Sequence, residues 1–313
     1  MSLNMNNNSF SNNLIILQWN VRSLSARLPS LMHLLHAHRC SIAILSETWL
    51  NPSRSINIPF FRIYRSDRPD GFGGVAVAIH HSLKSRPILI DNIIRNNLNN
   101  YKMDIIGVEI VSDSSPPLEI WSCYIPSSSN VPVIVWQSLF SLISCNSILC
   151  GDFNSFHPAW GSDSSSPRGN IIYNTIDSLG LCILNDGSPT HIGRLNSTDS
   201  AIDLSFCSPN LYWNLSWHTL GEPHGSDHIP IIISATNRSL SNFTRSHHQP
   251  NNILISHTPY NFNKANWTSF RLNIHDAISS AAEDSALINS YSNFTEIILN
   301  AANLAIPVKK NQS

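Results

Sequence analysis

The chain has few charged side chains. They make up 12% of its 313 residues, which is about half the usual share. Nineteen basic and 20 acidic residues leave a formal net charge of -1. This balance disfavours a protein that binds nucleic acid through a uniformly basic surface. It leaves open a local cluster of Lys and Arg, because phosphate binding needs positive charge only at the groove.

The sequence also lacks the usual signals of membrane and secreted proteins. No apolar run reaches the roughly 18–20 residues that a membrane span requires. The Asn-rich residues 1–13 contain no basic start followed by an apolar stretch. Six scattered cysteines, mostly within apolar segments, are typical of reduced and buried thiols. We therefore expect an intracellular protein with no membrane partner and a disordered N-terminus over 1–13.

Short apolar runs rich in β-branched residues dominate what is present, and each is bounded by turn formers. This pattern predicts strands at Leu14 to Trp19, Ile42 to Leu45, Gly74 to Ile79, Ile105 to Val111, Leu118 to Tyr124, Ser147 to Cys150, Ala201 to Cys207 and Ile229 to Ser234. Helical periodicity lies between some of them, at Leu24 to Leu35, Val131 to Ile143 and Ile171 to Leu179. Strands with interspersed helices predict a layered α/β domain.

The composition shifts near residue 236. Residues 237–257 are rich in Ser, Asn and His without periodicity, which is typical of a linker. Residues 263–306 have a largely helical pattern. We therefore predict one catalytic domain over 14–236, followed by a linker and helical connector over 237–313.

Polar side chains stand at the ends of the predicted strands. Such positions converge on one edge of an α/β fold. They are Asn20, Glu47, Tyr124, Asp152, Asn154, Asp203, Asp227 and His228.

These residue types fit metal-assisted hydrolysis of a phosphodiester. Carboxylate and amide oxygens suit a hard cation such as Mg²⁺, and Glu47, Asn20 and Asp227 supply them. Asp152 is placed to take a proton from water, and Asn154 can donate to a phosphate. His228 can donate to the scissile phosphate, with Asp203 holding its tautomer.

Each motif alone also has an ordinary structural explanation. Ser226-Asp-His228 occurs in solvated turns and helix caps, and Gly151-Asp-Phe-Asn154 can be a plain turn. Asn20 and Tyr124 can be structural, Glu47 a solvated loop acid and Thr190 a turn residue. Their joint occurrence in one order, each at a strand edge, favours a shared site.

Six windows carry a family resemblance. They appear in the order seen in apurinic-endonuclease-like retrotransposon endonucleases: Gln18-Trp-Asn20, Ser46-Glu-Thr-Trp49, Tyr124-Ile-Pro126, Gly151-Asp-Phe-Asn154, Ser200-Ala-Ile-Asp203 and Ser226-Asp-His228. The flanks 151–161 and 184–190 resemble those of jockey-like non-LTR retrotransposons. The resemblance covers roughly residues 14–236, and 263–270 resembles the connector toward a reverse transcriptase in such elements.

The resemblance implies a DNase I-like four-layer α/β sandwich of the endonuclease/exonuclease/phosphatase superfamily, with two packed mixed sheets between helices. It implies nicking of nuclear DNA to give a 3′-hydroxyl primer for a reverse transcriptase domain of the same polyprotein. It makes Glu47 and Asn20 ligands of Mg²⁺ (or Mn²⁺), with Asp227 nearby. Tyr124 and Thr190 become substrate contacts, beside the catalytic residues Asp152, Asn154, Asp203 and His228.

Other readings of the sequence remain open. The same site would serve a cellular abasic-site repair nuclease, a phosphatase of the same superfamily, or a decayed remnant that only binds DNA. A zinc site is not expected at His33, His36, His38 and Cys40, because no second ligand pair accompanies them; they are expected on a solvated helix face.

Two other groups of residues have local explanations. Gly71-Phe-Gly-Gly74 is expected to be a hairpin turn and not a phosphate-binding loop, because no Lys-Ser/Thr follows. Candidate DNA contacts in predicted loops are Arg22, Arg27, Arg65, Arg68, Arg168 and Arg194.

Overall fold

The computed structural model describes five stretches of the chain: 14–112, 116–193, 198–235, 264–282 and 291–307. The segment predicted to be disordered (1–13) and the predicted linker (237–257) lie outside them. The chain divides into two compact units, 1–246 and 247–313.

The first unit contains two mixed six-stranded sheets. One sheet has the order β11-β12-β1-β2-β4-β3. Its β1 and β2 are parallel, and the other neighbours are antiparallel. The strands are β1 (Leu14–Asn20), β2 (Ile42–Ser46), β3 (Phe61–Ser66), β4 (Val75–His80), β11 (Leu215–Thr219) and β12 (Ile231–Ala235).

The second sheet has the order β5-β6-β7-β8-β10-β9. Here β7 and β8 are the parallel pair, and the other neighbours are antiparallel. Its strands are β5 (Ser85–Pro87), β6 (Asp104–Ile110), β7 (Leu118–Tyr124), β8 (Ser147–Asp152), β9 (Cys182–Ile183) and β10 (Asp203–Cys207).

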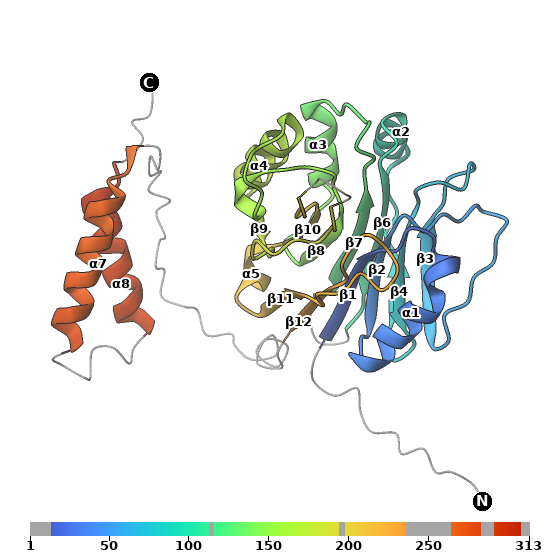
Figure 1. Ribbon diagram of the computed structural model, residues 1–313, viewed down its shortest axis with the longest axis horizontal. Helices are drawn as coiled ribbons and strands as arrows, with labels where there is room; N and C mark the ends of the chain where they lie inside the picture. Colours follow the sequence, from blue (N-terminus) through green and yellow to red (C-terminus); the bar gives the residue numbers. More distant parts are fainter. Residues whose placement is uncertain (1–13, 113–115, 194–197, 236–263, 283–290, 308–313) are drawn as a thin grey trace, which may run out of the picture. The chain divides into compact units, whose positions relative to one another are not determined.

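The two sheets pack face to face, and helices cover their outer faces (Figure 1). Alternation along each strand assigns side chains to the two faces. In β2, Ile42 and Ile44 enter the core between the sheets, whereas Ala43 and Leu45 pack outward with helix α1. The helices are α1 (Leu24–Ala37), α2 (Asn92–Asn100), α3 (Val133–Phe140), α4 (Pro167–Leu179), the short α5 (Pro209–Tyr212) and the 3₁₀ turn η1 (Pro158–Trp160).

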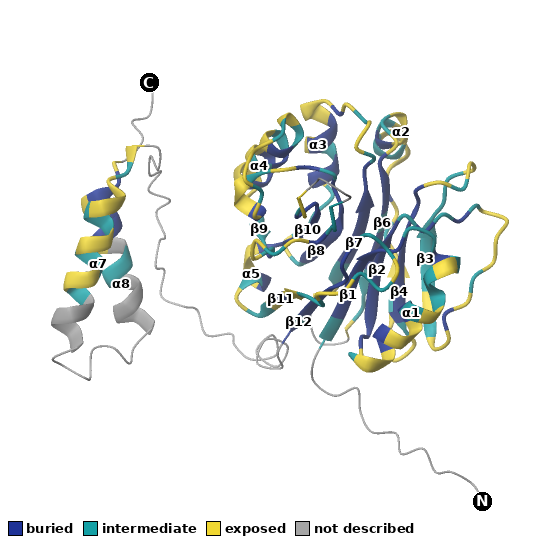
Figure 2. Ribbon diagram, in the orientation of Figure 1, coloured by how far each residue is buried: buried dark blue, intermediate teal, exposed yellow. Residues whose placement is uncertain are grey.

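Three hydrophobic layers hold these elements together. One lies between the sheets, one lies between the first sheet and α1, and one lies between the second sheet and the helices α2, α3 and α4. Figure 2 shows the central strands buried and the outward sides of the helices exposed. The predicted four-layer α/β sandwich is therefore confirmed.

Some elements were not predicted from the sequence. Strand β3 has arginines at two of its six positions, and its burial is only partial. Helix α2 is polar, with Leu98 its one buried residue. Neither has the buried apolar run used to recognise strands and helices. The glycine-rich segment 71–74 does join two antiparallel strands, β3 and β4, as expected of a hairpin, and His33 and His36 are solvent-exposed on α1.

The second unit contains a pair of helices, α7 (Trp267–Ala282) and α8 (Tyr291–Ala305). A small cluster of Ala302, Ala305 and Ile306 packs against Ala265 and Phe270. These helices agree with the helical pattern expected over 263–306, while their use as a connector remains a prediction. Among the residues that the structure describes, no helix has the length and apolar character needed to cross a membrane.

Candidate active site

Strand register brings the predicted site residues to one end of the two sheets. Asp152 at the end of β8 is paired with Tyr124 at the end of β7 and with Asp203 at the start of β10. In the facing sheet, Asn20 at the end of β1 is paired with Ser46 at the end of β2. Because Ile16, Ile148 and Cys207 point into the core between the sheets, the two-residue period turns Asn20, Asp152 and Asp203 the same way.

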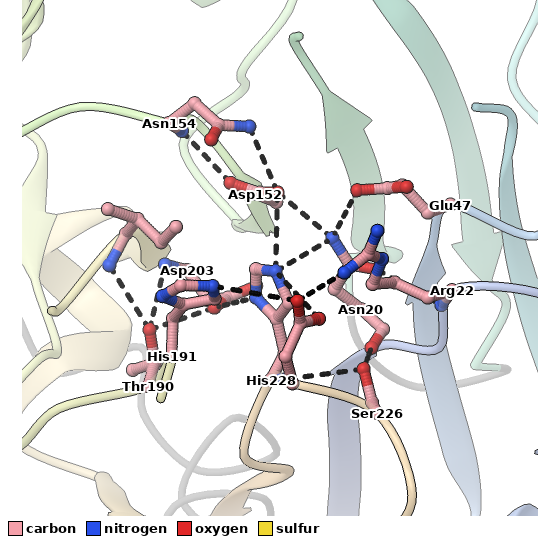
Figure 3. A network of polar contacts seen from close by, with 12 residues as sticks. Asn20, Arg22, Glu47, Asp152, Asn154, Thr190, His191, Asp203, Ser226 and His228 are labelled. Atoms are coloured by element: carbon pink, nitrogen blue, oxygen red, sulfur yellow. Dashed lines mark hydrogen bonds and ion pairs between the residues drawn. The ribbon is translucent and has the colours of Figure 1, made fainter. Parts of the chain in front are cut away.

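Asn20 joins the two sheets at this end. Its amide nitrogen donates to Glu47 Oε1 at 2.9 Å and to Asp152 Oδ2 at 2.9 Å (Figure 3). Its amide oxygen accepts from the backbone N–H of Arg22 at 3.2 Å. The Asn20 side chain is buried. In this orientation the Asn20 amide nitrogen bridges the carboxylates of Glu47 and Asp152. The amide would have to flip by about 180° for its oxygen to face a cation at that position.

Glu47 is held in an unusual backbone conformation. Its φ is 50°, and Trp49 two residues later has a φ of 51°. Non-glycine residues rarely adopt this left-handed region, and such strain gathers at functional sites. Backbone hydrogen bonds from Thr48 to Gly74 and from Trp49 to Gly73 fix the segment. Trp49 Nε1 also donates to Glu47 Oε2 at 3.0 Å, so both oxygens of Glu47 are oriented.

Asp152 is buried and is hydrogen-bonded to Asn154, which lies just beyond the end of β8. Asp152 Oδ1 accepts from the backbone N–H of Asn154 at 2.9 Å, and Oδ2 accepts from its amide at 3.1 Å. Asn154 also has a positive φ, 46°, which Asn tolerates better than most residues. Its amide donates further to the Ile125 carbonyl at 3.0 Å, so the two loops that follow β7 and β8 are tied together.

His228 forms a buried pair with Asp203. His228 Nδ1 lies 2.7 Å from Asp203 Oδ2, which leaves Nε2 directed toward Asp152 Oδ2 at 4.0 Å and Asn20 Nδ2 at 3.4 Å. The imidazole is therefore oriented by one carboxylate and faces the centre of the site with its other nitrogen. The indole N–H of Trp19 donates to the His228 carbonyl at 3.0 Å and fixes the backbone there.

Thr190 lies behind Asp203 and is hydrogen-bonded to it. Its side chain is completely buried. Its hydroxyl donates to Asp203 Oδ2 at 2.8 Å and accepts from the backbone N–H groups of Ile202 and Asp203. These hydrogen bonds position Asp203, and a substrate contact by Thr190 stays a prediction.

The charges of the site shift the pKa values of its central pair. Burial, together with the nearby carboxylates of Asp203 and Glu47, raises the pKa of Asp152 to about 7. Burial alone would lower the pKa of His228, but the carboxylates of Asp203, Asp152 and Asp227 outweigh it and raise this pKa to about 9. A carboxylate that titrates near neutrality beside a cationic imidazole is suited to proton transfer.

Asp227 is placed apart from the predicted metal ligands. Its carboxylate forms an ion pair with Arg22, and its other ionisable neighbours are His191 and His228. Burial alone would raise the pKa of Asp227, but His228 and Arg22 hold it below its ordinary value. Arg22 engages Oδ2 of Asp227 and leaves Oδ1 without a hydrogen-bond partner among the described residues, so a metal role for Asp227 beside Glu47 stays a prediction.

Tyr124 lies at the end of β7 and is nearly buried. Burial and the carboxylates of Glu47 and Asp152 raise its pKa, so it remains a neutral phenol. The guanidinium of Arg68 lies 5.5 Å from the centre of its ring, and Arg68 is itself paired with Asp104 at 2.8 Å. The phenol of Tyr124 thus stands beside the acidic cluster as a donor.

The donor set at Glu47, Asp152 and Asn20 fits a hard cation. Glu47, Asp152 and His228 each offer one ligand atom within 4.8 Å of the others. Carboxylate and amide oxygens are the ligands that Mg²⁺ takes, whereas it has little use for an imidazole nitrogen. Burial, and after it the nearby carboxylates of Asp203 and Glu47, raise the pKa of Asp152, and a bound cation would relieve the repulsion between these charges.

The predicted DNA-contacting arginines mostly have partners inside the protein. Contrary to expectation, three of them lie in regular elements: Arg27 in α1, Arg65 in β3 and Arg168 in α4. Arg65 pairs with Asp67, and Arg168 donates to five backbone carbonyls. Arg194 lies outside the described residues. Arg22 pairs with Asp227, and Arg68 lies over the Tyr124 ring.

His191 was not singled out from the sequence. It follows Thr190 and forms isolated β-bridges with Ser200 and His228. Its ring centre lies 4.7 Å from that of His228. Its adjacency to Thr190 was the only signal in the sequence. Ser226 is a second contact of this kind, since its hydroxyl donates to the Asn20 carbonyl at 2.8 Å and accepts from the His228 N–H.

Comparison with known proteins agrees with this architecture. The model of the endonuclease–reverse transcriptase family matches residues 118–232. The RNA-directed DNA polymerase from mobile element jockey of Drosophila melanogaster is 27% identical over 217 residues, which are 68% of this chain and 23% of that protein. The chain therefore spans about a quarter of the length of this curated relative.

Two solved structures share the fold. The endonuclease domain of TRAS1, a telomere-specific non-LTR retrotransposon, superposes with a TM-score of 0.59 at 21% identity, covering 72% of this chain and 99% of that domain. An AP endonuclease from Archaeoglobus fulgidus gives a TM-score of 0.55 at 16% identity, covering 70% of this chain and 98% of that one. Residues 118–232 of the chain thus match an endonuclease–reverse transcriptase family, and its homologues are jockey-like non-LTR retrotransposon proteins.

Proposed function

We propose that residues 14–235 form a metal-dependent DNA endonuclease that nicks one strand of a duplex and leaves a 3′-hydroxyl. The observation that carries the proposal is the convergence of Asn20, Glu47, Asp152 and the Asp203–His228 pair at one end of two facing sheets. Similarity to an endonuclease–reverse transcriptase family supports the nuclease activity. Mg²⁺ is the expected cation, and Mn²⁺ is the alternative with the same oxygen preference.

In the proposed reaction, Asp152 removes a proton from the attacking water. Its pKa, raised to about 7, lies close to neutral pH, where a general base works best. The water oxygen forms a bond to phosphorus, and the bond from phosphorus to the 3′-oxygen breaks. The 3′-oxygen takes up a proton from solvent and becomes a hydroxyl, Asp152 later releases its proton to solvent, and the phosphate remains on the 5′ end of the other fragment.

The remaining groups stabilise charge on the phosphate. His228, kept cationic by Asp203, donates from Nε2 to a non-bridging oxygen, and the Asn154 amide and Tyr124 phenol supply further donors. Glu47 and Asn20 would hold the cation, which supplies neutralisation of charge on the phosphate and the leaving oxygen. Two further residues position these groups: the Thr190 hydroxyl donates to Asp203, and the Arg168 guanidinium donates to the Asn154 carbonyl.

The proposal also includes a role for this domain within a longer polyprotein. The curated relatives are RNA-directed DNA polymerases of mobile elements. We infer that a nick made by this domain provides the primer for a reverse transcriptase domain of the same polyprotein, with 264–307 contributing to the connection. Such an enzyme would act in the nucleus, where the target DNA lies.

The experiment uses a supercoiled plasmid and two end-labelled duplexes, one intact and one with a single abasic site. We expect Mg²⁺-dependent nicking of the plasmid and of the intact duplex, and the nick should be extended by a DNA polymerase without phosphatase treatment. Cleavage confined to the abasic duplex would support a repair nuclease in its place. Binding of the duplex without cleavage would support a decayed remnant, and either result would overturn the proposal.

A further inference from the structure

A second group of metal-binding side chains lies beside the candidate active site. It consists of His191, Asp227 and His228, whose ligand atoms all lie within 4.8 Å of one another. His191 and His228 come from chain segments that pair in an isolated antiparallel bridge, so their rings stand next to each other (Figure 3). The proposed hydrolysis has no use for His191.

Both imidazoles are oriented in the manner of metal ligands. His228 Nδ1 is held by Asp203 at 2.7 Å, and His191 Nδ1 is held by the Ser200 hydroxyl at 3.3 Å. Histidines that bind metals almost always have their second ring nitrogen held by an oxygen in this way. The Nε2 atoms that remain face the Asp227 carboxylate, 3.8 Å from Oδ2 for His191 and 3.9 Å from Oδ1 for His228.

The Asp227 carboxylate, which lies between the two rings, has one oxygen without a hydrogen-bond partner among the described residues. Asp227 Oδ2 is engaged by Arg22. Asp227 Oδ1 is buried and has no hydrogen-bond partner among the residues that the structure describes. A buried carboxylate oxygen without a partner is costly, and a cation between Asp227 and the two rings would satisfy it.

We propose that His191, Asp227 and His228 form a three-ligand site for a transition-metal cation of the zinc class, separate from the oxygen-donor site at Glu47. Two nitrogens and one carboxylate oxygen are a zinc-type donor set, and three protein ligands leave a fourth position for water. The donors would have to draw together, since Zn–N bonds are about 2.0–2.1 Å long. Mg²⁺ prefers oxygen ligands, so the two sites select different ions.

This site shares His228 with the proposed hydrolysis. A metal bound to His228 Nε2 removes the donor that faces the phosphate. A zinc-class cation therefore inhibits Mg²⁺-supported nicking, a consequence that rests on the proposed function, whereas the metal binding itself does not.

The binding test uses the whole chain stripped of metal and titrated with Co²⁺, a coloured substitute for Zn²⁺, and with Zn²⁺ by calorimetry. His191→Gln is the test variant, and His33→Gln, on the exposed side of α1, is the matched control. The parent and H33Q should share one tight site, which H191Q loses. The expected loss of affinity exceeds about 100-fold, because removing even an outer partner of a ligand costs 10–100-fold. Equal affinity in H191Q and the parent, or no saturable site in the parent, would overturn the proposal.

A nicking assay separates this site from the proposed function. With Mg²⁺ present, added Zn²⁺ should inhibit the parent and H33Q, while H191Q should retain basal nicking and resist the inhibition. If the parent binds Co²⁺ at the His191 site but does not nick DNA, the proposed function fails and the metal site stands. If the parent nicks DNA and H191Q binds Co²⁺ like the parent, the metal site fails and the nuclease stands.

Discussion

Asp203 and His228 form the shortest link between the second sheet and the loop that enters β12. His228 Nδ1 lies 2.7 Å from Asp203 Oδ2, and both side chains are buried. The Thr190 hydroxyl donates to the same Oδ2 atom at 2.8 Å. The carboxylate therefore receives two donors on one oxygen, and the imidazole is fixed with Nε2 toward Asp152. This pair sets both the tautomer and the charge of His228.

We expect Asp203→Asn to slow nicking by a factor on the order of 10²–10³, the usual loss when one positioned donor to the reacting group is weakened. The amide cannot stabilise an imidazolium, so the raised pKa of His228 should fall in this variant. NMR titration of the His228 ring in EDTA measures that change. Asp163→Asn, at an exposed position, is the matched control. An unchanged His228 pKa in D203N would contradict the assignment.

The same pair predicts how stability depends on pH in the metal-free protein. The pKa of His228 rises from an ordinary 6.5 to about 9 on folding, so its contribution is fully present below 6.5 and is lost as pH rises through 9. The pKa of Asp152 is raised from an ordinary 3.8 to about 7, so its contribution to stability likewise falls as pH rises, over a lower range that ends near pH 7. Thermal melting in EDTA should therefore show a falling Tm between pH 7 and 9. A Tm that rises over this interval would refute the assigned shift.

The strands that carry the site could be predicted because they are short, buried and apolar. Strand β8, for example, is buried at all six positions and ends at Asp152. Its two-residue period then determines which end residues share a face. Residues such as Thr190 and Asp227 could not be assigned in this way. Both lie in loops, where the sequence carries no strand register.

A glycine before Asp152 is required by the packing of parallel strands. A Cβ on Gly151 would lie 1.8 Å from the Cys123 carbonyl oxygen in β7, a backbone atom that cannot move aside cheaply. Gly151→Ala should cost at least about 1–3 kcal/mol in the free energy of unfolding, the usual range for overpacking, and should displace Asp152. Urea unfolding measures the loss, with Ser164→Ala at an exposed position as control. Wild-type stability in G151A would show that the strands are not paired as described.

Arg168 organises the loops after β7 and β8. Its guanidinium donates to the carbonyls of Phe153, Asn154, Pro126, Ser127 and Ser129. A lysine ammonium cannot reach both loops with a planar fork, so Arg168→Lys should lose at least about 1.5–3 kcal/mol, the worth of one charged hydrogen bond. Arg86→Lys, at an exposed ion pair, should change stability by no more than about 1 kcal/mol. Chemical denaturation of the two variants distinguishes them, and equal losses would contradict this role.

Arginine positions illustrate where the sequence is ambiguous. The local sequence around an arginine in a polar stretch is the same whether its guanidinium faces DNA or donates to carbonyls inside the protein. Arg168 is the second residue of α4, and its partners are up to 42 residues away. Such long-range partners cannot be found from local periodicity. Likewise, the positive φ of Glu47 occurs beside backbone hydrogen bonds from Thr48 to Gly74 and from Trp49 to Gly73, which local sequence does not reveal.

The central claim is tested most directly by plasmid nicking with Asp152→Asn and with the parent, at matched Mg²⁺ concentrations and in EDTA. Burial and like charges disfavour the ionised Asp152, so the amide should leave the fold at least as stable at neutral pH, and thermal melting checks this. The parent should nick with Mg²⁺ and not in EDTA, as should the Asp163→Asn control. D152N should be slower by a factor on the order of 10²–10⁴. A folded D152N that nicks as fast as the parent would contradict the account.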